Sequence, residues 1–478
     1  MYDVLIIGCG IVGAATAFEL SKYQLKVGIV ERENDVANGT TKANSAIIHA
    51  GYDPMPGSLM ARLNVRGSAL ARELCAQLDV PYLPCGSLVL GFSTEDEVLL
   101  KELFRRGTQN GVPGLALLTG DEARALEPNL SPAVTAALHA PSAAICSPWE
   151  YCLALAETAV RNGAQLYLET AVTGLTPTAD GWRVETSRGV LEARWVVNAA
   201  GLDAQAVHEM AAPSSFTIHP SRGEYFLLDK SEGGRVGRVI FQCPSRVGKG
   251  VLVAPTVHGN LIVGPNAEPV EGDDTATTAG GLAYVRQTAL RSVPSVEFRA
   301  SIRNFAGVRA STDREDFIIE EAAPHFLDLA GICSPGLSAA PAIGEYAVEL
   351  LGQAGLTLER KADFTASRKR VRFRELPPEE KARLVAEQPA YGRVICRCET
   401  VTEGEILDAL SGPIPPRSVD GVKRRAGAGL GRCQGGFCGP RVLELLAREQ
   451  GRSPGDIPQD KAGSWLLACE TKGGHADV

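Results

Sequence analysis

The chain has 478 residues, of which 45% are hydrophobic and 22% are charged, a composition typical of packed globular proteins and unlike that of disordered or fibrous ones. At about 150 residues per domain, this length predicts two or three domains. The 56 acidic residues outnumber the 48 basic ones, and the net charge of −8 argues against nucleic acid or an anionic membrane as a partner.

The first ten residues, MYDVLIIGCG, form an apolar run without the pattern of a basic leader or a cleavage site. No apolar stretch of about 18 residues follows, so we expect no integral membrane segment and a cytoplasmic location. Since that compartment keeps thiols reduced, the 12 cysteines are expected to be free thiols or metal ligands rather than disulfides.

The N-terminal part of the chain has the periodicity of a βαβ unit. Its predicted parts are a strand at residues 2–7, a glycine turn at 8–13, a helix at 14–22 and a second strand at 27–30. A strand, a glycine-rich turn and a helix in this order are typical of a dinucleotide site, because the N-terminus of the helix faces the phosphates.

The turn contains the glycines of a dinucleotide fingerprint, Gly8, Gly10 and Gly13. Gly8 allows the turn, Gly10 admits the pyrophosphate, and Gly13 lets the helix pack closely on the strand. Glu31 ends the second strand, where its carboxylate can accept hydrogen bonds from the ribose hydroxyls of an adenosine. These residues predict a dinucleotide but do not distinguish FAD from NAD.

Two kinds of pattern alternate in the rest of the first 360 residues. A helix is predicted at residues 151–162, followed by strands at 165–168, 182–186 and 195–197. Residues 80–145 and 216–300 instead contain alternating apolar segments bounded by Gly and Pro, which indicate an antiparallel sheet. The clearest of these segments are residues 225–228, 251–254 and 260–263.

Residues 361–392 are charged and contain several prolines, which predicts a linker or a connector on the surface. Four cysteines follow in two pairs, a Cys-x-Cys and a Cys-x4-Cys: Cys396, Cys398, Cys433 and Cys438. Four thiolates can saturate either a zinc ion or an iron-sulfur cluster, and the spacing alone allows both.

Residues 39–51, GTTKANSAIIHAG, resemble the flavin-contacting segment of FAD-dependent oxidoreductases of the D-amino-acid oxidase superfamily. Further similarity follows in the same order along the chain, at residues 248–256, 307–309 and 331–338. Within the superfamily, the chain is most similar to glycerol-3-phosphate oxidases and dehydrogenases and to L-2-hydroxyglutarate oxidases. The resemblance covers residues 1–355 and implies FAD as the cofactor.

This resemblance implies cofactor contacts in the fingerprint and in several later segments. They are Gly8, Gly10, Gly13, Glu31, Thr40, Thr41, Asn44, Ser45, Gly201, Gly307, Gly336, Leu337 and Ser338. Residues 331–340 resemble the loop that returns to the isoalloxazine ring and leads into a helix, expected at 341–351. Backbone amides at the start of that helix could stabilise negative charge on a reduced flavin.

Oxidation of a secondary alcohol by hydride transfer requires a base for the hydroxyl proton, and histidine can titrate near the working pH. The resemblance implies that His49 is this base, with a hydrogen bond to flavin or backbone as its alternative role. It also implies that Arg309 anchors an anionic substrate, for which the planar guanidinium is well suited. Lys249 is a second candidate near the substrate or the flavin.

Residues 394–401 and 429–439 resemble the small helical [2Fe-2S] domain related to bacterioferritin-associated ferredoxin. This resemblance implies that Cys396, Cys398, Cys433 and Cys438 bind a [2Fe-2S] cluster, with zinc as the alternative. The glycines around the second cysteine pair would let backbone N–H groups approach the sulfurs of the cluster.

The expected architecture combines α/β and α+β parts: a Rossmann-like FAD-binding domain, a substrate domain built on an antiparallel sheet, and a small helical [2Fe-2S] domain. The expected boundaries are 1–80, 145–215 and 300–360 for the FAD-binding domain, 81–144 and 216–299 for the substrate domain, 361–392 for the linker, 393–455 for the [2Fe-2S] domain and 456–478 for a tail.

A flavin domain followed by an iron-sulfur domain implies that electrons leave the flavin singly, which favours a dehydrogenase over an oxygen-using oxidase. The resemblance implies a small anionic substrate, with sn-glycerol 3-phosphate oxidised to dihydroxyacetone phosphate. Electrons would pass through or beside the [2Fe-2S] centre to a redox partner or electron carrier. The alternatives are a dehydrogenase of L-2-hydroxyglutarate or another 2-hydroxy acid, and a non-catalytic electron-transfer flavoprotein subunit.

Overall fold

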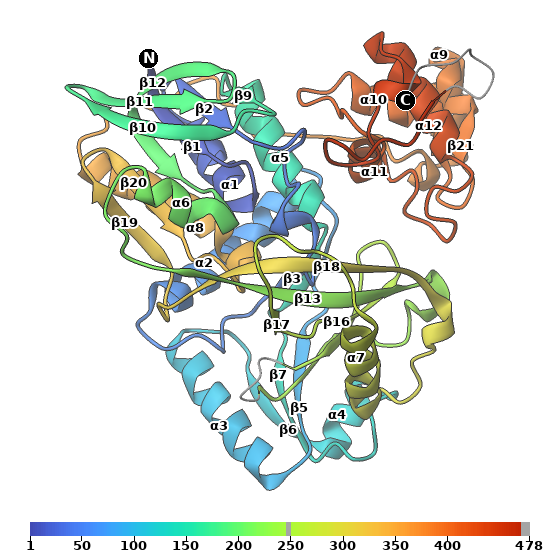
Figure 1. The fold of residues 1–478 in the computed structure, drawn as a ribbon. Coiled ribbons are helices and arrows are strands. Elements are labelled where there is room, and N and C mark those ends of the chain that lie inside the picture. Colours follow the sequence, from blue (N-terminus) through green and yellow to red (C-terminus); the bar gives the residue numbers. More distant parts are fainter. Residues whose placement is uncertain (245–249, 470–478) are drawn as a thin grey trace. The chain divides into compact units, whose positions relative to one another are not determined.

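The computed structural model describes residues 1–244 and 250–469 and divides the chain into two compact units (Figure 1). The first unit comprises residues 1–32 and 39–368. The second comprises residues 33–38 and the chain from Lys369 onwards. The chain therefore enters the second unit briefly, between two segments of the first, long before the main part of the second unit begins.

The first unit contains an eight-stranded sheet whose centre is parallel. Central strand β1 pairs in parallel with β2 on one side and with β12 on the other, so that Val4 aligns with Val27 and with Trp195. The strands are β1 (Tyr2–Ile7), β2 (Val27–Val30), β9 (Gln165–Tyr167), β10 (Val172–Thr178), β11 (Gly181–Thr186), β12 (Gly189–Asn198), β19 (Ile318–Ala323) and β20 (Phe326–Ala330). The main order is β10-β11-β12-β1-β2-β9, and β20 pairs with both β12 and β19. The predicted Rossmann-like arrangement is confirmed.

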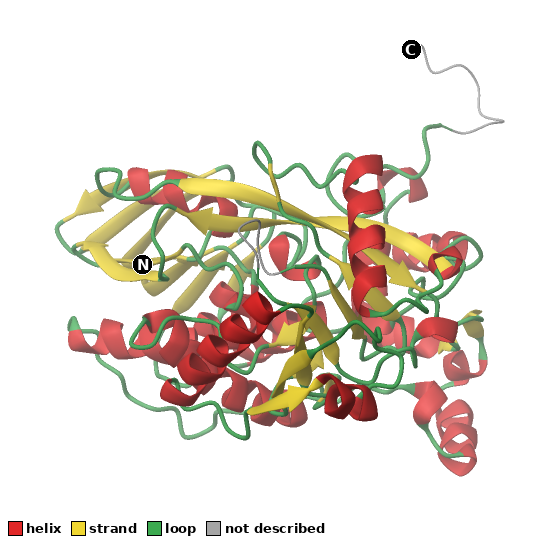
Figure 2. Cartoon of the chain, turned by 90° about the horizontal axis from the view of Figure 1, so that it is seen from below, coloured by secondary structure: helices red, strands yellow, loops and turns green. Residues whose placement is uncertain are grey.

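Four helices pack together beside this sheet, and in Figure 2 helices lie below the strands nearest the N-terminus. They are α1 (Ile11–Leu20), α2 (Leu59–Gln77), α5 (Pro148–Arg161) and α8 (Gly336–Gln353), with α1 against α5 and α8, and α8 against α2. A Cβ on Gly344 of α8 would lie 2.7 Å from the carbonyl oxygen of Ala15, so the close packing of α8 on α1 depends on glycine. Helix α8 begins before the predicted position, and Pro341 lies within it.

The predicted antiparallel sheet is present as a nine-stranded sheet. Its strands are β5 (Ser87–Gly91), β6 (Ala116–Thr119), β7 (Ala136–Ala140), β13 (Ile218–Leu228), β14 (Val239–Gln242), β15 (Leu252–Pro255), β16 (Leu261–Gly264), β17 (Glu268–Pro269) and β18 (Ser301–Thr312). Long strands β13 and β18 run side by side along their whole length (Figure 1), and only the pair β5–β14 is parallel among the described strands of this sheet.

Both faces of the nine-stranded sheet are covered by apolar clusters, because side chains alternate along each strand. In β5, Val89 belongs to one cluster, whereas Leu88 and Leu90 belong to the other. Helix α3 (Thr94–Gln109) contributes to the first cluster, and α4 (Gly120–Leu126) and α7 (Ala279–Ser292) contribute to the second. The remaining elements of this unit are β3 (Ile47–Ile48), β4 (Tyr82–Leu83) and β8 (Ala144–Cys146), which form a small sheet, and α6 (Ala204–Glu209).

The second unit is small and mainly helical, as predicted. Its elements are α9 (Pro378–Glu387), β21 (Val394–Cys396), β22 (Val401–Thr402), α10 (Glu403–Leu410), α11 (Val419–Ala426) and α12 (Gly439–Gln450). The core of this unit contains Ile406 of α10, Val422 of α11 and Leu446 of α12. Cys396 and Cys438 belong to the same core, so two of the four predicted ligands are anchored in packed structure.

The structure differs from the expected boundaries at three places. Strand β18 belongs to the nine-stranded sheet, because it pairs with β13, although it was expected in the FAD-binding domain. Residues 369–392, expected to be a linker, belong to the second unit and contain α9. Residues 33–38 also belong to the second unit. The remaining boundaries stay predictions.

Within residues 1–244 and 250–469, no helix combines the length and the apolar character needed to cross a lipid bilayer.

Candidate functional site

The glycine turn after β1 is too tight for side chains at two of its positions. Gly8 has a φ of +99°, and a Cβ there would lie 2.5 Å from the carbonyl oxygen of Ala199. A Cβ on Gly13 would lie 2.0 Å from the carbonyl oxygen of Gly8. Gly10 is the N-cap of α1 and provides no side chain to cover the first N–H groups of the helix. The turn therefore presents the backbone amides that a pyrophosphate requires.

Two polar side chains border this turn. The carboxylate of Glu31 accepts the N–H of Cys9 at 2.7 Å, which places it beside the turn at the end of β2. Thr41 Oγ1 accepts the N–H of Ile11 at 3.0 Å and so binds one amide at the start of α1. The position of Glu31 suits the predicted contact with an adenosine ribose.

The segment expected to contact the flavin lies against strands β13 and β18 of the nine-stranded sheet. Thr40 Oγ1 donates a hydrogen bond of 2.7 Å to the carbonyl oxygen of Val308 in β18. Ser45 Oγ lies 3.1 Å from the hydroxyl of Tyr225 in β13. A Cβ on Gly307 would lie 1.8 Å from a carbonyl oxygen of this segment, so the two backbones approach as closely as glycine allows.

Asn44 maintains the shape of the same segment. Its Nδ2 donates to the carbonyl oxygens of Thr40 and Thr41 at 3.3 and 2.8 Å, and its Oδ1 accepts the N–H of Ala46 at 2.8 Å. Ala46 has a φ of +62°, a conformation that this local hydrogen bond supports. The side chains of Thr40, Thr41, Asn44 and Ser45 thus hold the segment in place, and their predicted contacts with the cofactor stay predictions.

His49 follows β3 and is held by the start of α8. Its backbone N–H donates to Ser338 Oγ at 2.7 Å, and this hydroxyl lies 3.3 Å from the carbonyl oxygen of Ile47. The imidazole Nε2 lies 3.4 Å from Ser334 Oγ. The ring stacks on Phe241 of β14, with 5.7 Å between the centroids and 28° between the planes. Ser334 and Phe241 therefore contact the imidazole from two separate parts of the chain, and Ser338 holds the backbone of His49.

The N-terminus of α8 is suited to negative charge. Its first turn contains Gly336, Leu337 and Ser338, no acidic residue, and no side-chain cap on its N–H groups. The partial positive charge of a helix N-terminus favours an anion placed against it. Since Ser338 binds the backbone of His49, this end of the helix and the candidate base lie together.

The guanidinium of Arg309, in β18, hydrogen-bonds to neutral carbonyl oxygens. Its Nη1 donates to the carbonyl oxygen of Ser221 at 3.4 Å, and its Nη2 donates to that of Asn266 at 3.2 Å. A Cβ on Gly223 would lie 2.4 Å from Nη2, so the guanidinium passes over a glycine of β13. In the described part of the chain, no carboxylate lies within ion-pair distance of Arg309, which leaves its charge for an anionic ligand.

Two further predicted site residues are Gly201 and Lys249. Gly201 has a φ of +61° and begins the short turn that follows β12, at the end of the parallel sheet where a dinucleotide is expected. Lys249 lies outside the described residues.

The four predicted metal ligands converge in the second unit. Cys396 Sγ lies 3.7 Å from Cys398 Sγ, Cys398 Sγ lies 4.0 Å from Cys433 Sγ, and the thiols of Cys396 and Cys438 also hydrogen-bond. The thiols thus form a chain of contacts, and within the residues described no three His, Cys, Asp or Glu side chains have the geometry to hold a metal ion. A set of four soft thiols is nevertheless the donor set of an iron-sulfur cluster.

The surroundings of the thiols also fit a cluster. A Cβ on Gly431 would lie 2.5 Å from Cys398 Sγ, so the backbone lies close against the sulfurs. The amide of Phe437 hydrogen-bonds to Cys433 and lowers the pKa of that thiol. The thiol of Cys396 donates a hydrogen bond to Cys438, which lowers the pKa of Cys438 and raises that of Cys396. Backbone N–H groups directed at sulfur stabilise thiolates, which are the metal-binding form.

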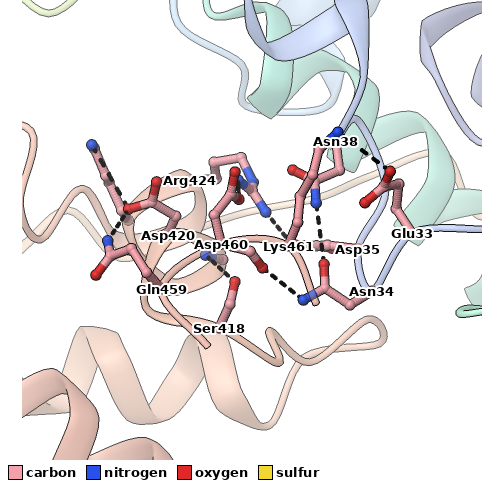
Figure 3. Close-up of polar contacts among 12 residues, drawn as sticks. Glu33, Asn34, Asp35, Asn38, Ser418, Asp420, Arg424, Gln459, Asp460 and Lys461 are labelled. Atoms are coloured by element: carbon pink, nitrogen blue, oxygen red, sulfur yellow. Dashed lines mark hydrogen bonds and ion pairs between the residues drawn. The ribbon is translucent and has the colours of Figure 1, made fainter. Parts of the chain in front are cut away.

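A buried ion-pair network joins the segment of residues 33–38 to the rest of the second unit (Figure 3). Asp35 accepts hydrogen bonds from Arg425 Nη1 and Nη2, both at 2.7 Å, and from Arg424 Nη2 at 3.0 Å. Arg424 also pairs with Asp460 at 2.8 Å, whose carbonyl oxygen accepts a hydrogen bond from Asn34. Burial raises the pKa of Asp35, but the two guanidiniums outweigh burial and lower it overall.

Several residues that shape these sites are not predicted from the sequence. Phe241 and Asn266 orient His49 and Arg309 from distant positions, and neither belongs to a recognisable motif. Asp35 is also missed, because an acidic residue in a loop resembles any solvated one. The buried carboxylate of Asp328 pairs with His208 at 2.6 Å beneath the end of β12, and its only local signal is an acidic residue inside an apolar strand.

Comparison with protein families gives two matches. The model for FAD dependent oxidoreductases matches residues 3–350, and the model for the BFD-like [2Fe-2S] binding domain matches residues 394–448.

Three relatives illustrate the similarity to known proteins. A glycerol 3-phosphate dehydrogenase of Caloramator mitchellensis is 48% identical over 477 residues, which are 99% of either chain. The mitochondrial L-2-hydroxyglutarate dehydrogenase of Homo sapiens is 31% identical over 56% of this chain and 61% of its own. The solved structure of the L-alpha-glycerophosphate oxidase from Mycoplasma pneumoniae, with FAD bound, has a TM-score of 0.72 and 32% identity, and it covers 77% of this chain and 98% of its own.

Proposed function

Because this chain belongs to the FAD dependent oxidoreductase family, we propose that it is a dehydrogenase that oxidises sn-glycerol 3-phosphate to dihydroxyacetone phosphate. The observation that carries the proposal is the 48% identity to a glycerol 3-phosphate dehydrogenase along the whole chain. The predictions of an FAD-dependent oxidoreductase and of a BFD-like [2Fe-2S] domain are both confirmed by the family matches.

The C-terminal unit supports a dehydrogenase rather than an oxidase. The glycerophosphate oxidase structure matches over 98% of its own length but over 77% of this chain, whereas the dehydrogenase relative matches 99% of this chain. Unlike the oxidase, the dehydrogenase relative therefore also matches the part of the chain that contains the four cysteines. A one-electron centre there gives electrons a route other than molecular oxygen.

The residues of the first unit have distinct roles in this proposal. His49 Nε2 takes the proton of the substrate hydroxyl, and Arg309 binds the phosphate through its guanidinium. Ser338 holds the backbone of His49, and Phe241 stacks on its imidazole, so that little orientational freedom remains to be lost on the way to the transition state. When bound, FAD supplies the acceptor for the hydride that leaves the carbon atom.

The cofactors are held by separate parts of the chain. The turn from Gly8 to Gly13 would bind the pyrophosphate of FAD, and Glu31 the adenosine ribose. The four cysteines of the second unit would hold the [2Fe-2S] cluster, which carries one electron at a time. We propose that these electrons pass to a separate redox partner or electron carrier.

Anaerobic reduction of the bound flavin tests the substrate. When mixed anaerobically with the holoprotein, glycerol 3-phosphate should bleach the flavin absorbance, and L-2-hydroxyglutarate should not. Bleaching by the hydroxy acid alone would support the rival activity instead. Bleaching by neither compound, combined with reduction by a partner protein, would indicate a non-catalytic electron-transfer subunit.

Substitution of His49 tests the proposed base. His49→Ala should slow flavin reduction by glycerol 3-phosphate about 100-fold or more, because general-base catalysis is lost, while the FAD content stays unchanged. His219→Ala, which removes an exposed imidazole from β13, is the matched control and should retain the rate of the unsubstituted protein. Equal rates for both variants would exclude His49 as the base.

A further inference from the structure

A large aromatic side chain lies exposed between two ligands of the predicted cluster. Phe437 lies in the Cys-x4-Cys loop and is 86% exposed, although its own amide hydrogen-bonds to the thiol of Cys433. Single exposed apolar residues are common on protein surfaces, so the exposure of Phe437 alone does not define a site. The backbone amide of Phe437 contacts the sulfur of a predicted ligand. The charges of the residues around Phe437 therefore bear on what can bind beside the cluster.

The two ligand loops, residues 394–399 and 429–438, form a basic surface. Arg397 and Arg432 are both exposed. The one acidic residue of these loops, Glu399, is buried and accepts a hydrogen bond from Arg374 at 3.0 Å. No described carboxylate lies within ion-pair distance of Arg397. The two loops thus contain two exposed arginines and one buried carboxylate, although the chain as a whole carries a net charge of −8.

Two of the four thiols lie closer to solvent than the other two. Cys396 and Cys438 are buried in the core of the second unit, whereas Cys398 is exposed and Cys433 is half-buried. The sulfurs nearest to solvent thus belong to the same loops as the two arginines and Phe437. An electron that leaves the cluster has its shortest way to solvent on this side.

We propose that Arg397, Cys398, Arg432 and Phe437 form the docking surface for an acidic one-electron carrier protein. This inference rests on the proposed function. Phe437 provides an apolar contact at the centre of a small transient interface, and the arginines attract the carrier and orient it. Oxidation of one glycerol 3-phosphate releases two electrons and two protons, so two carrier molecules each gain one electron per turnover.

Electron transfer to carriers of opposite charge tests the proposal. The full-length holoprotein is reduced with dithionite, freed of excess reductant, and mixed anaerobically with cytochrome b5, which is acidic, or with cytochrome c, which is basic. The second-order rate constant should be higher for cytochrome b5 at low ionic strength, and it should fall as salt is added. Arg397→Glu and Phe437→Ala should each lower the rate constant for cytochrome b5 about tenfold or more.

Two controls separate docking from damage to the cluster. Arg383→Glu reverses an exposed charge on α9, outside both ligand loops, and should leave the rate constants unchanged. Iron content, visible spectrum and reduction of a small uncharged quinone should be the same in all variants. If Arg397→Glu fails to retain iron, Arg397→Gln provides the same test, with a smaller decrease in rate and a weaker dependence on salt.

The proposal is overturned if both loop variants transfer electrons to cytochrome b5 within twofold of the unsubstituted protein, or if cytochrome c is the faster acceptor at low salt. Because dithionite supplies the electrons, this outcome does not depend on the substrate. Failure of glycerol 3-phosphate to bleach the flavin, together with normal transfer to cytochrome b5, would overturn the proposed function and retain the docking surface.

Discussion

Replacement of Asp35 with asparagine should destabilise the second unit and leave the first unit unchanged. The buried carboxylate is hydrogen-bonded to Arg425 twice and to Arg424 once. Removing one partner of a buried ion pair leaves uncompensated charge and costs about 3–5 kcal/mol. Arg424 retains Asp460, and Arg425 retains two carbonyl acceptors, so we expect a loss near the lower end, about 3 kcal/mol.

Two optical probes distinguish the units in a urea titration of the full-length holoprotein. Loss of the visible absorbance of the cluster reports on the second unit, and the rise of flavin fluorescence on release reports on the first. With a slope of about 1–3 kcal/mol per molar urea, the midpoint of the first probe should fall by about 1–3 M, and that of the second should stay constant. Glu444→Gln removes an exposed pair with Arg441 and should leave both midpoints nearly unchanged.

The pH dependence gives a second measure of the same interaction. Because the folded-state pKa of Asp35 is lowered, its contribution is complete above the unfolded-state pKa, about 3.9, and is lost as pH falls through the folded-state value. The difference in stability between the original protein and Asp35→Asn should therefore be constant from pH 8 to pH 5. Equal midpoints at pH 7, or a difference that vanishes between pH 7 and pH 5, would refute the reasoning.

Three further predictions concern the cofactor and substrate sites. Gly13→Ala should abolish FAD retention after desalting, because its Cβ would lie 2.0 Å from a carbonyl oxygen of the turn, whereas Gly280→Ala in α7, with no atom within 4 Å of the added Cβ, should retain FAD. Arg309→Gln should raise the KM for glycerol 3-phosphate about 10- to 100-fold, since charge-assisted hydrogen bonds to the phosphate are lost, and an unchanged KM would exclude it as the anchor. Cys398→Ser should lower the iron and sulfide content of the purified protein, and Cys469→Ser should not; equal loss in both variants would contradict the predicted ligand set.

Local features of this protein, such as the glycine turn and the cysteine pairs, can be predicted from its sequence because short-range sterics and chemistry determine them. A turn with Gly8 and Gly13 between a strand and a helix has few alternatives, since larger residues would collide with backbone. The cysteine pairs predict a soft-metal domain in the same way, because thiol spacing limits the groups that can bind. Such patterns predict a dinucleotide site and a four-thiol metal site, and the resemblance to known families implies FAD, a [2Fe-2S] cluster and the oxidoreductase family, which the family matches confirm.

Only the tertiary structure decides which distant residues meet. His49 is oriented by Ser338 and Phe241, which lie far from it in the chain, and no periodicity encodes those contacts. The assignment of residues 33–38 to the second unit depends likewise on the pairing of Asp35 with Arg425, across nearly the full chain. The sequence alone determined which chemical groups and local elements are present, whereas their partners depend on long-range packing, because a side chain in a loop has the same local pattern whether it is solvated or buried against a distant charge.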